Sequence, residues 1–167
     1  MSEDAFELPE HAVAIRDSRM KRVAEHLPES DDLSLIALKG HLLAEEALSD
    51  IARVYCASPE LLDDDRLSFS AKLIFAKAVA PRGVPAYIWT SVAMLNSLRN
   101  VLSHRLESPE ARKRLRRYLQ HVENVVPDNP WIDRQNEAAW LKGAIIWTLV
   151  CLAAVQARTK EYRDAGH

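Results

Sequence analysis

The chain has 167 residues, of which 48% are hydrophobic and 28% are charged, and its formal net charge is -2 at pH 7. This length fits one globular domain, and this apolar content argues against global disorder, so we expect a single domain over residues 1–167 with its own core. Two cysteines are too few for a disulfide framework. Cys56 and Cys151 both lie in apolar periodic segments, where we expect buried, reduced thiols.

Two segments bear on where in the cell the protein is located. The first 25 residues carry four acidic residues before any apolar run, which is the wrong charge for a secretory signal, so we do not expect export. The most apolar stretch, Gly143 to Val155, is shorter than the roughly 20 residues that span a bilayer. We therefore expect a buried core helix there, a cytoplasmic protein and no membrane association.

Proline spacing and apolar periodicity predict an all-α fold. All eight prolines lie between segments of helical period, and no alternating strand pattern appears. Asp31 or Asp32, Ser68 and Ser108 are the expected N-caps, with Pro109 at a first helical position. The sequence thus predicts an up-and-down bundle of five or six helices, with a core over about 31–126 and a long C-terminal helix. The expected helices cover about 10–27, 32–56, 68–79, 86–106, 109–126 and 135–162.

Three features predict how the helices pack. Gly40 and Gly143 lie inside long helices, where glycine costs about 1 kcal/mol relative to alanine, so each is expected to mark a close helix crossing. The second and last helices each carry a set of apolar residues that we expect to be buried. These sets are Leu35, Leu38, Leu42, Leu43, Ala47, Ile51 and Val54 in the second helix, and Trp140, Ile146, Trp147, Val150 and Val155 in the last.

Charge is unevenly distributed along the chain. Between residues 25 and 65, eleven acidic residues face only Lys39 and Arg53, whereas between residues 99 and 117 seven basic residues face only Glu107 and Glu110. A concentrated arginine surface suits a phosphate backbone. The same residues could instead form a solvated helix face that pairs with the acidic half of the bundle. The sequence leaves both interpretations open.

The segment from Asn96 to Glu107 carries the candidate chemistry. At 100° per residue, six of its polar residues share one arc of the helix, opposite its leucines: Asn96, Arg99, Asn100, Ser103, His104 and Glu107. Arginine grips two phosphate oxygens at once, and histidine exchanges a proton near neutral pH, so this inventory suits a phosphodiester. Further expected phosphate or substrate contacts are Asn96, Ser103, Arg105, Arg112 and Arg116.

These groups could cleave RNA without a metal. His104 would act as general base on the ribose 2′-hydroxyl or as acid on the leaving oxygen, while Arg99 stabilises the charge on phosphorus and Asn100 shapes the pocket. One histidine does not easily serve as both acid and base, so two copies of the helix meeting across a twofold axis would complete the site. Trp89, Val92 and Ala93 continue the polar arc upstream; they are either the dimer contact or covered by another helix of the bundle.

Arg99, a polar Asn100 and His104 in a leucine-rich helix resemble the signature of the HEPN superfamily. The helix from Ala37 to Leu48 also resembles the glutamate-bearing helix of its mannitol-repressor-like branch. The resemblance implies an all-α bundle that dimerises. It also implies one of two functions: a metal-independent endoribonuclease of a toxin, phage-defence or RNA-processing system, or a non-catalytic binding module. The partner of such a ribonuclease would be an antitoxin or a regulatory protein. Toxins of one HEPN group carry tyrosine two residues after the histidine, where this chain has Leu106, so control by modifying that tyrosine is not expected.

His41 and Glu45 form the competing site. They lie four residues apart on one helix face, a spacing that can ligate metals in bundles, but no further Glu-x-x-His motif accompanies them. A polar pair that supports packing is the alternative, with Glu45 hydrogen-bonding Arg99 from across the bundle. We expect no cofactor and no metal. The sequence therefore predicts a dimeric HEPN-type ribonuclease, with a non-catalytic nucleic-acid or protein-binding module second and a helical scaffold third.

Overall fold

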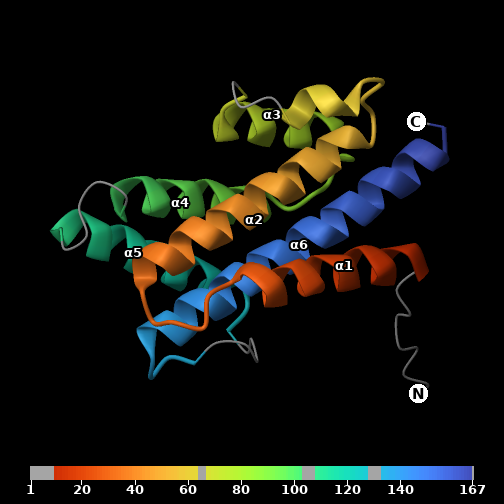
Figure 1. The fold of residues 1–167 in the computed structure, drawn as a ribbon. Helices are drawn as coiled ribbons and strands as arrows, with labels where there is room; N and C mark the ends of the chain where they lie inside the picture. The colour runs from red at the N-terminus through yellow and green to blue at the C-terminus, as the bar shows by residue number, and fades with distance from the viewer. Residues whose placement is uncertain (1–9, 64–66, 103–107, 128–132, 167) are drawn as a thin grey trace, which may run out of the picture.

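The computed structural model of the chain describes residues 10–63, 67–102, 108–127 and 133–166. Throughout these ranges the regular structure is helical, which confirms the predicted all-α bundle (Figure 1). The elements are α1 (Glu10–His26), α2 (Leu33–Arg53), the 3-10 helix η1 (Pro59–Asp63), α3 (Phe69–Val79), α4 (Ala86–Leu102), α5 (Pro109–Val125) and α6 (Glu137–Asp164).

Side-chain caps fix where four of these helices begin, namely α2, α3, α5 and α6. The Asp32 carboxylate accepts hydrogen bonds from the backbone N–H groups of Ser34 and Leu35 at the start of α2. Ser68 and Ser108 accept one backbone hydrogen bond each at the starts of α3 and α5. Each cap satisfies a backbone donor that the first helical turn leaves unpaired, so the predicted caps are confirmed.

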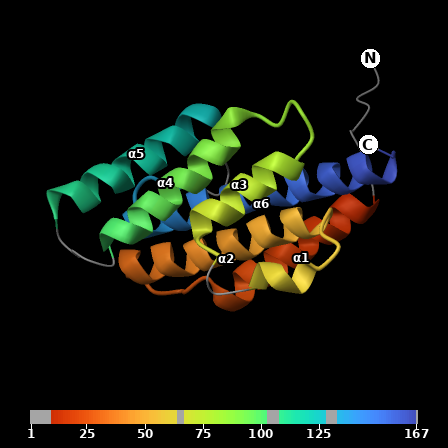
Figure 2. The same ribbon diagram turned by 90° about the horizontal axis from the view of Figure 1, so that it is seen from above.

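Helix α6 lies in the middle of the bundle, where it packs against α1, α2, α4 and α5. Figures 1 and 2 show α2 running alongside α6, with α4 and α5 paired at one end and α3 at the other. α6 is long and apolar enough to cross a membrane, but 61% of its most apolar window is buried inside the bundle, as expected for a core helix.

Gly40 marks the close crossing of α2 and α6 that the sequence predicts. A Cβ atom built on Gly40 would lie 2.6 Å from Cδ1 and 2.9 Å from Cγ2 of Ile145. Ile145 is fully buried, so little free space surrounds its side chain. Glycine is therefore required for this approach of the two backbones.

The predicted buried face of α2 is partly wrong. Leu35, Leu38 and Leu42 are 36%, 36% and 47% exposed. The buried face is instead wide and rich in small residues, because α6, α3 and α4 all pack on it and alanines permit close approach. Its members are Ile36, Ala37, Gly40, Leu43, Ala44, Ala47, Leu48 and Ile51.

The predicted centre of α6 also needs correction. Trp147 and Val155 are buried as expected, whereas Trp140, Ile146 and Val150 are only half-buried. These three lie on the flanks of the helix because its most deeply buried residues form a different row, spaced three and four residues apart. That row consists of Leu141, Ile145, Leu149 and Leu152, all fully buried.

The cysteines differ in their surroundings. Cys56 is exposed, contrary to prediction, because α2 ends at Arg53 rather than reaching residue 56. Cys151 is largely buried on α6, and burial raises the pKa of its thiol to about 12. Neither forms a disulfide.

Candidate functional site

Helix α4 presents Arg99 and Asn100 at its C-terminal end. Leu95, Leu98 and Leu102 anchor the helix in the core, which fixes the orientation of the polar residues between them. Arg99 is half-buried, and its Nη1 donates a hydrogen bond of 3.0 Å to Oδ1 of Asn100. Within the described residues Arg99 has no acidic partner, and its buried Nε has no hydrogen-bond acceptor. The guanidinium charge is thus not neutralised by a carboxylate of the described chain.

A polar contact joins α2 to α4 one turn before Arg99. Nε2 of His41 lies 3.0 Å from Oδ1 of Asn96 and donates to it, because the amide oxygen can only accept. The His41 ring also stacks on Phe69 of α3, with ring centroids 4.4 Å apart. Burial, and next the positive charge of Arg99, lower the pKa of His41. His41 is therefore a neutral, buried residue that holds three helices together beside Arg99.

Glu45 does not make the predicted hydrogen bond to Arg99. Its Oε1 lies 2.8 Å from Nζ of Lys72, which reaches it from α3. This correction has a simple cause, since α3 packs closely on α2 and places a cation beside the carboxylate. His41, one turn earlier on the same helix, is the residue of α2 whose pKa the Arg99 charge lowers.

The His41 and Glu45 pair does not lead to a metal centre in the described part of the chain. Each is engaged elsewhere, His41 by Asn96 and Phe69 and Glu45 by Lys72. No group of three or more His, Cys, Asp or Glu residues suited to a metal ion occurs among the residues described.

Several candidate residues lie outside the described residues. Ser103, His104 and Arg105 belong to the segment 103–107 between α4 and α5. Of the apolar residues upstream on α4, Trp89 and Val92 are buried and Ala93 is exposed. Since Trp89 and Val92 are covered within the bundle, they cannot provide the alternative dimer contact.

Helix α5 carries an exposed basic face. Arg112, Lys113, Arg116 and Arg117 are all exposed and border a surface depression of about 450 Å³ that ends at Gln120. None of these four cations makes an ion pair in the described structure. The proposed pairing of this face with the acidic half of the bundle is therefore wrong.

The acidic residues of α2 are paired elsewhere. Glu45 contacts Lys72, Glu46 contacts Arg22, and Asp50 contacts both Arg19 and Arg53. These local contacts leave no carboxylate of α2 to neutralise α5.

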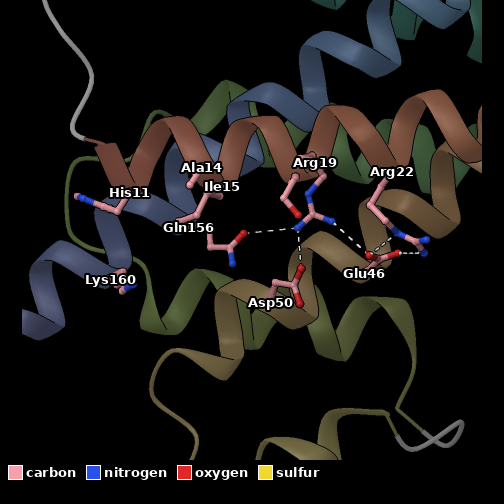
Figure 3. A pocket seen from close by; sticks show the side chains of 10 residues that line it. His11, Ala14, Ile15, Arg19, Arg22, Glu46, Asp50, Gln156 and Lys160 are labelled. Atoms are coloured by element: carbon pink, nitrogen blue, oxygen red, sulfur yellow. Dashed lines mark hydrogen bonds and ion pairs between the residues drawn. The ribbon is translucent and has the colours of Figure 1, made fainter.

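Sequence reasoning missed a polar pocket between α1, α2 and α6. The cavity holds about 330 Å³ and is lined on one side by Arg19, whose side chain is only 4% exposed. Figure 3 shows Arg19 pointing from α1 toward Asp50, Glu46 and Gln156. Its Nη2 donates to Asp50 at 2.7 Å and to Gln156 at 3.5 Å.

A second arginine completes this ion-pair cluster. Arg22 grips the Glu46 carboxylate with two hydrogen bonds of 3.0 Å. The hydrogen bond from Arg22 lowers the pKa of Glu46 and keeps it ionised. The burial of Arg19 could have been predicted from the sequence, because Arg19 shares the buried side of α1 with Ala12 and Val23 at helical spacing.

Comparisons with known proteins give no family for this chain. No model of a known protein family matches it, and no match was found among curated proteins or solved structures.

Proposed function

We propose that the protein is a metal-independent endoribonuclease of the HEPN type, acting as a homodimer with Arg99 and His104 in a shared cleft. The observation that supports this most is the state of Arg99. Its guanidinium is half-buried, has no acidic partner in the described chain and is held by Asn100 at the end of α4 that leads into residues 103–107. A cation kept without a counter-ion at such a position suits an anionic ligand.

The cleavage chemistry follows from the residue types. The 2′-hydroxyl of the substrate would lose its proton to one histidine and attack the adjacent phosphorus, while the second subunit's imidazole protonates the 5′-oxygen that leaves. Arg99 would stabilise the negative charge that develops on the phosphoryl oxygens. His41 does not take the place of His104, since it is buried, neutral and hydrogen-bonded to Asn96.

The second candidate is a non-catalytic module that binds nucleic acid or a partner protein through the same surface. The unpaired cations of α5 favour binding whether or not cleavage follows. The two functions differ in one product, a cut RNA strand.

The test uses purified protein and RNA in EDTA. We expect fragments with cyclic-phosphate or 3′-phosphate ends, lost in His104→Ala and reduced at least about 100-fold in Arg99→Ala. His26→Ala, which removes an exposed imidazole on α1, is the matched control and should cut like the wild type. Activity per chain should fall on dilution as the dimer dissociates. Binding without cleavage that Arg99→Ala abolishes would establish the module instead, and cleavage retained in His104→Ala would exclude the proposal.

A further inference from the structure

The outward face of α5 carries more positive charge than the fold requires. At 100° per residue, Lys113 and Arg117 lie opposite the buried Leu115 and Leu119, whereas Arg112 and Arg116 lie on the exposed flank next to Leu119. They form two rows, Arg112 with Arg116 and Lys113 with Arg117, each pair about 6 Å apart along the axis. Like charges at this spacing repel each other and destabilise the helix slightly.

Nothing in the described structure neutralises these rows. The two acidic residues of α5 are already paired, Glu110 with Arg114 and Glu123 with Arg134. Arg114 also donates to Ser97 of α4, so it ties the two helices together and does not belong to the free face. The four remaining cations keep their charge for a partner outside the bundle.

The residue types on this face limit which kinds of partner could bind there. Three of the four cations are arginines, whose planar fork matches two phosphate oxygens at once. The depression between the rows is lined by Pro109 and Gln120 besides the cations, with no aromatic side chain on which a base could stack. It has no exposed leucine or phenylalanine either, so it offers nothing to insert into a bilayer. Contacts to a sugar–phosphate backbone, independent of base sequence, fit these features.

We propose that the outward face of α5 is a docking track for the phosphate backbone of single-stranded RNA. The track begins at the N-terminal end of α5, the end of the bundle where α4 finishes (Figure 1). RNA lying on it would therefore be directed toward the end of α4 that carries Arg99. The choice of RNA rests on the proposed function, and a single strand is required because attack by the 2′-hydroxyl needs an alignment that a stacked duplex prevents.

The test measures binding apart from cleavage. The probe is a fluorescent, mixed-sequence single-stranded RNA with 2′-O-methyl sugars, which this chemistry cannot cut, titrated at several salt concentrations. Four phosphate contacts predict that the logarithm of the association constant falls with the logarithm of salt at a slope of about -2.8. Lys113→Glu with Arg117→Glu should weaken binding at least about tenfold at low salt and reduce this slope by half or more.

Matched controls make the result specific. Lys77→Glu with Arg158→Glu changes the net charge equally at two exposed, unpaired cations on α3 and α6, and should bind like the wild type. Lys113→Gln with Arg117→Gln should give a smaller loss in the same direction. Equal binding by both charge-reversed proteins would overturn the proposal, as would tighter binding to duplex RNA or to anionic lipid vesicles than to the single strand.

The docking track and the nuclease can fail separately. If wild-type protein binds the 2′-O-methyl strand with the expected salt slope but never cuts RNA, the docking track is supported and the proposed catalysis is refuted. If RNA is cut and the α5 variants bind and cut like the wild type, the nuclease stands and the track is refuted.

Discussion

The two charged regions of this molecule differ in where their counter-ions are. Between α1, α2 and α6, the arginines Arg19 and Arg22 face Glu46 and Asp50 at short distances, and Arg19 is almost fully buried. On α5, Arg112 and Arg116 face solvent with no carboxylate in reach within the described residues. The first set joins helices, whereas the second makes no ion pair within the described residues and is available for a ligand. Substitutions between α1, α2 and α6 should therefore lower stability and leave binding unchanged, whereas substitutions on α5 should weaken binding and leave stability nearly unchanged.

The largest effect is expected at Arg19. Arg19→Ala removes a buried cation that contacts Asp50 and Gln156, and should lower the free energy of unfolding by about 3 kcal/mol, measured by urea denaturation. Arg16→Ala is the control, since the Arg16 side chain is 43% exposed and, among the described residues, pairs only with its neighbour Asp17; it should change stability by less than about 0.5 kcal/mol. A loss below about 1 kcal/mol for Arg19→Ala would show that its ion pairs do not hold α1 in place.

Gly40 tests packing without changing charge. Gly40→Ala gains about 1 kcal/mol in helix propensity but forces a methyl group against the buried Ile145, so we expect a net loss of about 1–2 kcal/mol in unfolding free energy. Adding Ile145→Val removes the nearest carbon atom and should restore part of that loss. Higher stability of Gly40→Ala alone would contradict the close crossing.

A smaller effect concerns pH and His41. Because its pKa is lower in the folded chain than its unfolded value of about 6.5, the unfolded chain binds the proton first as the pH falls. The stability contributed by neutral His41 is complete above about pH 6.5 and declines below it, until the folded pKa is reached. Urea denaturation at pH 7.5 and 5.5 should show a greater loss for the wild type than for His41→Gln. Equal losses would mean that other groups set this dependence.

The smallest effect on stability is expected on α5. Lys113→Glu with Arg117→Glu removes cations that pair with nothing in the described chain, so unfolding free energy should change by less than about 0.5 kcal/mol. Combined with lost RNA binding, this would complete the contrast with Arg19→Ala, which should leave binding by any remaining folded protein unchanged. A large loss of stability would instead assign the basic face a structural role.

Local signals made the starts of α2, α3 and α5 predictable. Asp32, Ser68 and Ser108 cap helices through contacts only two or three residues away, so their sequence neighbourhood contains the whole interaction. Gly40 was informative for a similar reason, because glycine destabilises the interior of a helix and its presence there indicates close packing. The buried face of α2 was harder to predict, since its alanines carry little hydrophobic signal and its exposed leucines carry much.

The candidate site depends on contacts that are distant in sequence. The position of Arg19 on the buried side of α1 was visible, but its partners Asp50 and Gln156 lie 31 and 137 residues away. Glu45 likewise took its cation from α3 rather than from Arg99. The unpaired state of α5 could not be read from net charge, because the sequence does not show which acidic residues other arginines and lysines occupy.

The central position of α6 has a consequence when the chain unfolds. This helix is long and apolar enough to cross a bilayer, and in the fold the surrounding helices cover most of its apolar window. A copy that unfolds, for example through loss of the Arg19 contacts, exposes a segment that chaperones, proteases and lipid would all compete to bind. Quality control in the cell would thus act on this chain through the same helix that forms the centre of its core.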